Sequence, residues 1–193
     1  MRIKKEKEKG MEMQSKSKQR SKELTAFLKS VKMLSQQDKI NLRNSVGKSF
    51  EKASREKGMI SFLMKTELPD MYLSEENMSI LFYVAGLQAK QSLDKDNYDS
   101  EKSVLAQNVL RYLYQTSSDS TKAGIEKFIQ KSKTMGTGKS LTTLNNFLSR
   151  TPFYDKLNLL QLLSDLVTWN YSDDIRIKWA LAIADGNDTD ISE

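Results

Sequence analysis

The chain has no cysteine and no histidine among its 193 residues. Without cysteine, disulfides, thiolate nucleophiles and zinc–thiolate sites are excluded. Without histidine, the commonest general base and the commonest metal ligand are missing, so a serine–histidine–aspartate hydrolase cannot be built. Chemistry that uses lysine or carboxylates alone stays open. The composition favours a protein that is not an enzyme and predicts no cofactor, no metal site and no small-molecule substrate.

Proline and glycine are also scarce, with 2 and 8 residues. A strand-rich sandwich would need more turn residues, so the abundance of Leu, Lys, Ser, Gln and Glu favours helices. No stretch approaches the length of about 18 apolar residues that a membrane span needs. The first residues, Met1 to Lys7, lack the apolar core of a secretory signal. We therefore expect no membrane contact and a cytoplasmic location.

Positive charge is concentrated at the start of the chain. The formal net charge is +6, and residues 1–22 alone hold nine Lys/Arg and three Glu, which is also +6. Residues 23–193 hold 22 basic and 22 acidic side chains, so they are neutral overall. Any binding of nucleic acid by the folded part must therefore depend on how its charges are distributed.

That distribution is uneven. Residues 23–50 carry five basic and two acidic side chains, and residues 122–150 carry six and one. Residues 65–101 and 151–193 each carry three basic and eight acidic side chains. The two basic segments could form one groove for a polyanion, with the acidic segments facing protein neighbours. Ordinary solvated helix faces are the alternative interpretation.

Apolar residues recur at helical spacing along most of the chain. The pattern predicts a second helix from Gln36 to about Arg55. Ser74 and Ser172 precede acidic residues and are typical helix N-caps, and Thr151-Pro152 predicts a further helix start. Both tryptophans lie on apolar helical faces and are expected to pack in the core. The sequence predicts an all-α fold of two small bundles with about eight or nine helices.

Composition also divides the chain into regions. The first residues have too few apolar side chains to offset chain entropy, and the polar, turn-prone residues after 93 are typical of a linker. The predicted regions are a disordered basic tail (1–22), an N-terminal helical bundle (23–94), a linker (95–102), a C-terminal helical bundle (103–184) and an acidic tail (185–193).

The segment Gly136-Thr137-Gly138-Lys139-Ser140 resembles the end of a nucleotide-binding phosphate loop. The full pattern needs a glycine five residues before Gly138, where this chain has Lys133, and it needs a buried strand upstream. Nucleotide hydrolysis is therefore the weakest hypothesis for this segment. A lysine flanked by glycines could still contact a backbone phosphate.

Residues 162–169 read Leu-Leu-Ser-Asp-Leu-Val-Thr-Trp, and residues 174–180 read Asp-Ile-Arg-Ile-Lys-Trp-Ala. They resemble a Leu-rich helix ending in Asp-Leu-x-x-Trp, followed by a basic helix with Arg-x-x-Trp-Ala. These are features of the CasB family, the small subunit of the type I-E CRISPR surveillance complex called Cascade. Weaker similarities follow the same order along residues 38–43, 79–87, 125–129 and 141–150, so that the resemblance covers about residues 23–184.

There are two departures from the family. Where the family has two arginines before a Phe-x-x-Leu-Leu motif, this chain has Ala123 and Gly124. Where the family has a Leu-Gly-Arg segment, this chain has Leu105-Ala106-Gln107. The resemblance implies a non-catalytic subunit that helps to hold the target and displaced DNA strands of an R-loop in antiviral defence. Its partners would be the other Cascade subunits, a second copy of this chain, the guide RNA and both DNA strands. A helical protein–protein adaptor without nucleic-acid binding is the alternative.

Lysine and arginine suffice for such a role, because each neutralised phosphate releases counterions and no base needs to be read. R-loop formation is nearly balanced in free energy, so modest backbone contacts can shift it. The residues predicted to bind nucleic acid are Lys39, Arg43 and Lys52 in the first bundle and Arg111, Lys122, Lys127, Lys131, Lys133, Lys139 and Arg150 in the second.

Overall fold

The computed structural model describes residues 18–48, 62–68, 74–93, 103–132, 134–169 and 171–185. Within these ranges the protein has nine α-helical segments and no strand, which confirms the predicted all-α fold. Residues 18–32 and 62–65 are helical. The other elements are α2 (Gln36–Arg43), α5 (Glu75–Leu93), α6 (Ala106–Thr116), α7 (Asp119–Lys131), α8 (Thr137–Leu148), the 3₁₀ helix η4 (Tyr154–Lys156), α9 (Leu159–Trp169) and α10 (Asp173–Ala184). In the described part of the chain, every helix is too short or too polar to cross a membrane.

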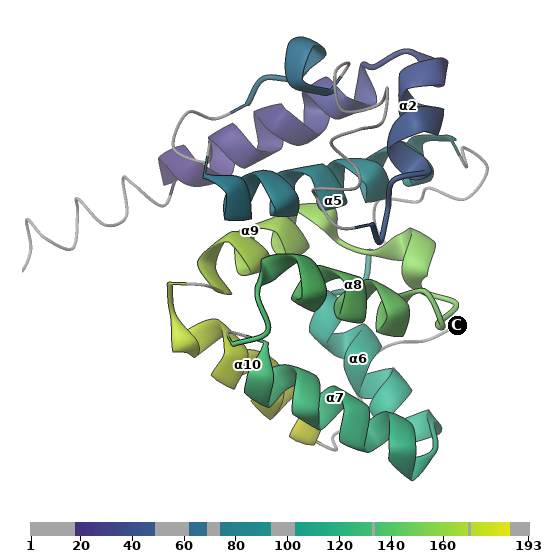
Figure 1. Cartoon of the computed structure of the whole chain (residues 1–193), viewed down its shortest axis with the longest axis vertical. Helices are drawn as coiled ribbons and strands as arrows, with labels where there is room; N and C mark the ends of the chain where they lie inside the picture. The colour runs from purple at the N-terminus through teal and green to yellow at the C-terminus, as the bar shows by residue number, and fades with distance from the viewer. Residues whose placement is uncertain are drawn as a thin grey trace, which may run out of the picture.

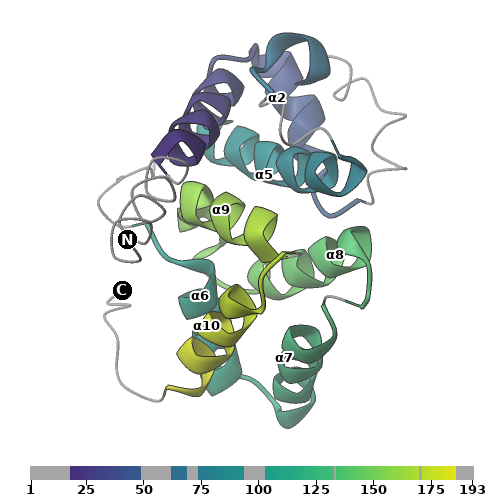
Figure 2. The same ribbon diagram turned by 90° about the vertical axis from the view of Figure 1, so that its left-hand side faces the viewer.

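Helix α5 lies at the centre of the molecule (Figures 1 and 2). It packs against α2 on one side and against α8, α9 and η4 on the other. Fourteen of its 19 residues are buried, since a helix covered on several sides needs apolar residues around its whole circumference. Although α5 falls within the predicted N-terminal bundle, it also contacts helices of the predicted C-terminal bundle. The predicted linker 95–102 lies outside the described residues.

Side-chain caps explain where several helices begin. The Ser74 hydroxyl accepts a hydrogen bond from the Asn77 amide at 3.3 Å, at the start of α5. The Ser172 hydroxyl accepts one from the Asp174 amide at 3.1 Å, at the start of α10. Each bond satisfies an amide that has no partner within its helix. The predicted starts of α5 and α10 are therefore confirmed.

The helix predicted from Gln36 to Arg55 is wrong in its length. Helix α2 ends at Arg43, and residues 44–48 form a turn. Gly47 has a φ of 80°, which a right-handed helix does not allow. Residues 49–61 lie outside the described part of the chain. The apolar spacing of the segment is compatible with a longer helix, but the glycine breaks it.

The helix start predicted at Thr151-Pro152 is also wrong. The Val104 amide donates to the Lys156 carbonyl at 2.8 Å, and the Asn158 amide donates to the Val104 carbonyl at 2.9 Å. These two bonds hold the chain extended between η4 and α9. Helix α9 therefore begins later, at Leu159.

The first helix begins within the predicted tail, because residues 18–22 are already helical. Gln19 donates from its side-chain amide to the Glu23 carboxylate at 2.9 Å, and the Thr25 hydroxyl donates to the Ser21 carbonyl at 2.8 Å. Lys, Gln and Arg are good helix formers, so a polar turn can extend a helix that is fixed by the packing of its later residues. The remaining residues of the tail, 1–17, lie outside the described ranges, as do residues 186–193 at the other end.

Helices α2 and α5 cross closely at Gly86. A Cβ atom at this position would lie 2.5 Å from Val46 Cγ2 and 3.1 Å from the Leu42 carbonyl oxygen. We expect Gly86→Ala to lower the free energy of unfolding by about 1–3 kcal/mol, the usual cost of overpacking a core. Urea denaturation followed by circular dichroism measures the change.

Gly124→Ala, in the middle of α7, is the matched control. A Cβ atom there would lie 3.5 Å from the Phe147 ring, which is ordinary van der Waals contact. Because alanine is the better helix former, this variant should be unchanged or more stable by up to about 1 kcal/mol. Equal stability of the Gly86 and Gly124 variants would show that the helices do not cross as closely as described.

Candidate nucleic-acid interface

Four of the predicted cations are exposed on or beside α7 and α8, and we call them the α7–α8 basic surface: Lys127, Lys131, Lys139 and Arg150. Lys127 and Lys131 are one helical turn apart on α7. None of the four forms an ion pair with a described residue. Residues 127–150 contain no Asp or Glu, so no carboxylate in this segment competes with a bound phosphate.

Packing of α8 decides which of its side chains face solvent. Leu141, Leu144 and Leu148 are buried at helical spacing, and this leaves Lys139 and Arg150 exposed near the two ends of the helix. The Ser140 hydroxyl donates to the Ser132 carbonyl at 2.8 Å, which joins the first turn of α8 to the end of α7. The chain neighbours of these two serines are Lys139 and Lys131, so both lysines lie at the same corner of the molecule.

The turn after α2 brings the first basic segment against α8. The Thr142 hydroxyl lies 3.2 Å from the Gly47 carbonyl oxygen, 95 positions away in the chain, and 3.0 Å from the Gly138 carbonyl oxygen of its own helix, so that its one proton is shared between these two acceptors. A Cβ atom at Gly47 would lie 2.8 Å from the Asn145 side-chain nitrogen, so the turn lies directly on the helix. Arg43 is exposed and precedes Gly47 by four residues. Figure 2 shows α2 and the turn on the same side of the molecule as α8 and α7.

Asn145 also fixes α8 to the helices behind it. Its side-chain oxygen accepts hydrogen bonds from the Tyr154 hydroxyl at 2.6 Å and the Tyr83 hydroxyl at 3.3 Å. Burial raises the pKa of Tyr83 well above its usual value, and burial and the nearby Asp155 raise the pKa of Tyr154 to about 12. Both hydroxyls therefore keep their protons near neutral pH and remain donors.

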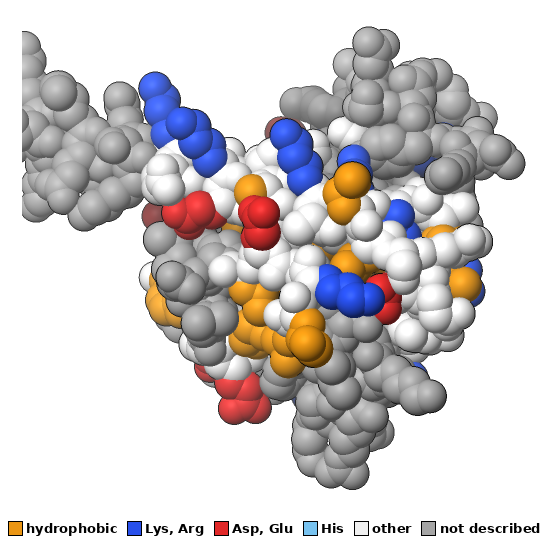
Figure 3. Space-filling view, turned by 90° about the horizontal axis from the view of Figure 1, so that it is seen from above, with side chains coloured by type: hydrophobic (Ala, Val, Ile, Leu, Met, Phe, Trp, Pro, Cys, Tyr) orange, Lys and Arg blue, Asp and Glu red, His pale blue; other side chains and the backbone are white. Residues whose placement is uncertain are grey.

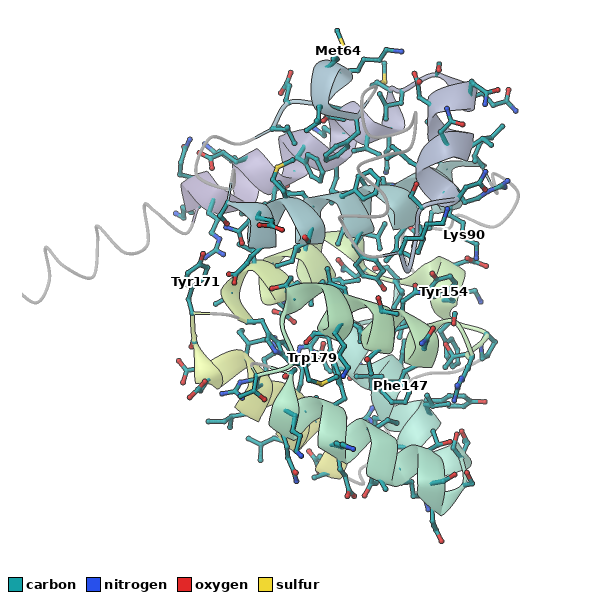
Figure 4. All side chains as sticks on the ribbon, viewed as in Figure 1. Met64, Lys90, Phe147, Tyr154, Tyr171 and Trp179 are labelled. Carbon is teal, nitrogen blue, oxygen red and sulfur yellow. The ribbon has the colours of Figure 1, made fainter. Side chains whose placement is uncertain are left out.

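An ion pair flanks this network on its outer side. Lys90 Nζ lies 2.5 Å from an Asp155 carboxylate oxygen and 4.4 Å from the centroid of the Tyr154 ring. Figure 4 shows Lys90 and Tyr154 at the same edge of the molecule. Because Lys90 is engaged in this way, we do not count it among the cations that would hold a phosphate.

The other predicted site residues differ in their surroundings. Lys39 is half-buried on α2, one turn before Arg43. Lys122 is half-buried and lies 3.6 Å from the Asp119 carboxylate, so its charge is partly compensated. Lys52 and Lys133 lie outside the described residues. Lys39 and Arg43 precede the turn that contacts α8 by eight and four residues, and Lys122 is less suited to bind a phosphate.

Arg111 is a correction to the predicted set. It is only 5% exposed, on α6, which packs against α7, α8 and α10. A guanidinium buried to this extent offers almost no open surface to a phosphate. Gln107, one helical turn earlier on the same face of α6, is also buried, so this side of the helix faces the core.

Sequence reasoning missed the residues that position the site. Gly47, Thr142 and Asn145 carry no charge, and their contact joins two segments far apart in the chain. The only local signal was Gly47 itself, since a glycine inside a helical pattern can mark a break. Nothing in the sequence pattern pointed to its partner on α8.

The face seen from above differs from the α7–α8 basic surface. Figure 3 shows basic, acidic and hydrophobic side chains side by side on it. Met64, at the top of the molecule in Figure 4, is 80% exposed. A polyanion would meet carboxylates and apolar atoms as well as lysines here, so we do not place the interface on this face.

Within the described ranges, no three carboxylates form a group that could hold a metal ion. In comparisons with protein-family models, with curated proteins and with solved structures, the chain has no match.

Proposed function

We propose that the chain binds the backbone of nucleic acid through the α7–α8 basic surface and the adjoining end of α2. In this proposal it is the non-catalytic small subunit of a type I-E CRISPR Cascade complex. The proposed binding function is supported chiefly by the contact of Gly47 with Thr142, because this contact brings two basic segments together that are separate in the chain. The Cascade assignment rests on the sequence resemblance alone.

The cations of this region suit binding without sequence preference. Long Lys and Arg side chains can follow a phosphate backbone, and each contact gains free energy from counterion release. Base readout would need side chains aimed into a groove, which the proposal does not require because a guide RNA would supply the specificity. Contacts of this kind would add to the stability of an R-loop without any chemical step.

Fluorescence anisotropy with labelled single-stranded DNA tests the proposal. The chain used should be full-length, with the six Lys/Arg of residues 1–17 replaced by Gln, so that the tail adds no positive charge. If the six cations Lys39, Arg43, Lys127, Lys131, Lys139 and Arg150 each contact a phosphate, log K should fall with log[salt] with a slope of about −4. DNA strands of unrelated sequence should bind alike. Absence of binding by this chain would exclude the proposal.

A protein–protein adaptor is the second candidate, and one observation favours it. Ile177 and Leu181 lie one turn apart on the outer side of α10 and are 54% and 64% exposed. Trp179 and Ile183 of the same helix are buried, so α10 has apolar residues on both sides. An exposed apolar pair of this kind is typical of a helix that binds another protein. The adaptor alternative predicts that the tail-neutralised chain has no affinity for DNA.

A further inference from the structure

A cleft of about 210 Å³ lies between helix 18–32, α5 and the start of α9. Four separate parts of the chain line it, and none of the described lining residues belongs to α7 or α8 or to the proposed nucleic-acid interface. None of the described lining residues is acidic. Among the described residues, the cleft is therefore a second place where an anion meets no carboxylate in the walls, independent of the proposed function.

One wall of the cleft carries lysines. Lys29 and Lys32 are exposed on helix 18–32 and both line the cleft. Lys29 forms no ion pair with a described residue. A free ammonium group beside a polar cleft attracts an anion and can donate up to three hydrogen bonds to it.

The wall opposite is the N-terminus of α9. The Asn158 side-chain oxygen accepts from the Gln161 amide at 3.0 Å and caps the helix. The amides of Leu159 and Leu160, which line the cleft, precede the first intrahelical hydrogen bond and have no partner within the helix. The helix dipole adds partial positive charge at this end. Lysines on one side and amide donors on the other together suit a phosphate group.

A buried acceptor in the cleft indicates what else the ligand carries. Gln88 lines the cleft and is only 4% exposed. The Ser92 hydroxyl donates its proton to the Gln88 backbone carbonyl at 2.7 Å, so it can only accept from the Gln88 side-chain nitrogen, 3.3 Å away. This fixes the orientation of the Gln88 amide and leaves its side-chain oxygen without a donor among the described residues. This oxygen is not among the fully buried side-chain atoms that lack a partner, so it is accessible from the cleft, and a ligand hydroxyl could donate to it.

We propose that this cleft binds a sugar phosphate. Lys29, Lys32 and the first amides of α9 hold the phosphate oxygens, and a sugar hydroxyl donates to the Gln88 side-chain oxygen. The cleft is smaller than the roughly 300 Å³ at which pockets for drug-sized ligands begin, so it takes one sugar phosphate unit and not a dinucleotide. The same unit occurs as a free sugar phosphate and at the phosphorylated end of a nucleic-acid strand.

Isothermal titration calorimetry of the full chain tests the site with three probes: ribose 5-phosphate, methyl phosphate and ribose. Ribose 5-phosphate should bind saturably, methyl phosphate at least about tenfold more weakly because it has no hydroxyl for Gln88, and ribose not at all. A 5′-phosphorylated oligonucleotide that displaces ribose 5-phosphate would identify a strand end as the source of the ligand. If the oligonucleotide does not displace ribose 5-phosphate, the source of the ligand is a free sugar phosphate.

Two variants separate the parts of the site. Lys29→Glu should weaken ribose 5-phosphate binding about tenfold or more, while Lys18→Glu, with the same change of net charge at the other end of helix 18–32, should leave it unchanged. Gln88→Met should lower the affinity for ribose 5-phosphate to that for methyl phosphate. Thermal melting checks that the Gln88→Met variant is folded. The comparison of ribose 5-phosphate with methyl phosphate on the unmodified chain tests the same contact without a substitution.

The proposal is overturned by any of three results. These are no heat of binding at about 10 mM ribose 5-phosphate, equal affinity for ribose 5-phosphate and methyl phosphate, or equal weakening by Lys29→Glu and Lys18→Glu.

Discussion

Trp179→Ala is expected to lower the free energy of unfolding by about 3–5 kcal/mol, the usual cost of removing a buried tryptophan. Trp179 is fully buried, and its ring lies edge-on to Trp169 with 4.8 Å between the ring centroids. Its indole N–H donates to an Asp165 carboxylate oxygen at 2.9 Å. The substitution therefore leaves a cavity and also removes a donor from a carboxylate that is only 2% exposed. Since domains are typically stable by about 5–15 kcal/mol, the loss would remove a large part of the free energy of unfolding.

Urea denaturation followed by circular dichroism measures this effect, and two further variants divide it. Trp179→Phe keeps most of the ring and removes only the donor to Asp165, so it should cost roughly 1–3 kcal/mol. Tyr171→Ala removes an aromatic side chain that is 69% exposed, just before α10, and should change stability by less than about 0.5 kcal/mol. If Trp179→Ala were as mild as Tyr171→Ala, α10 would not be packed on α9 as described.

The tryptophans show how far the sequence determines this part of the fold. Trp169 and Trp179 were predicted to lie in the core, and they are 5% and 0% exposed. Apolar spacing predicts burial well, because a residue on the apolar stripe of a helix has to be covered. Trp169 donates to the Ser132 hydroxyl at 3.0 Å, and its ring centroid lies 6.0 Å from that of Phe128, so it ties α9 to α7. Figure 4 shows Trp179 in the interior, among helices of the C-terminal half.

The errors of the sequence prediction share a physical origin. Arg111 is predicted to bind nucleic acid because it lies one turn beyond Leu105-Ala106-Gln107, the segment compared with the family, yet the direction of a side chain depends on which helices cover its own. Helix α2 stops at Arg43 because of one glycine, and α9 starts late because Val104, more than 50 residues earlier, holds Leu157 in an extended bridge. Local propensity cannot contain such distant contacts.

The candidate interface could be predicted only in part for the same reason. The charge counts identified residues 23–50 and 122–150 as basic segments, and all four cations of the α7–α8 basic surface come from residues 122–150. What sequence could not show is that the turn at Gly47 lies on α8, since that contact depends on the packing of α2 and α8 against α5. The cleft proposed to bind a sugar phosphate could likewise not be predicted, because its walls come from four separate parts of the chain.

Charge reversal at Lys131 and Lys139 together is expected to reduce the affinity for single-stranded DNA on the order of 100-fold at ~0.1 M salt. Each lost phosphate contact removes roughly a factor of five under these conditions, and the new carboxylates of Lys131→Glu and Lys139→Glu repel the backbone. The slope of log K against log[salt] should become shallower by about 1.4, or 0.7 for each contact. Anisotropy titrations of the tail-neutralised chain measure both quantities.

Lys18→Glu with Lys22→Glu is the matched control, since both lysines are exposed on helix 18–32 and the net charge changes equally. A general electrostatic attraction depends mainly on net charge, so it would be weakened alike by both pairs. Local contacts predict a large loss only for the pair at the corner of α7 and α8. The same corner variant should shorten the lifetime of a synthetic R-loop, because the exchange of strands is so nearly balanced that a few backbone contacts decide it. Equal losses for the two pairs would mean that the protein attracts DNA without holding it at this surface, and the contact between Gly47 and α8 would then have no part in binding.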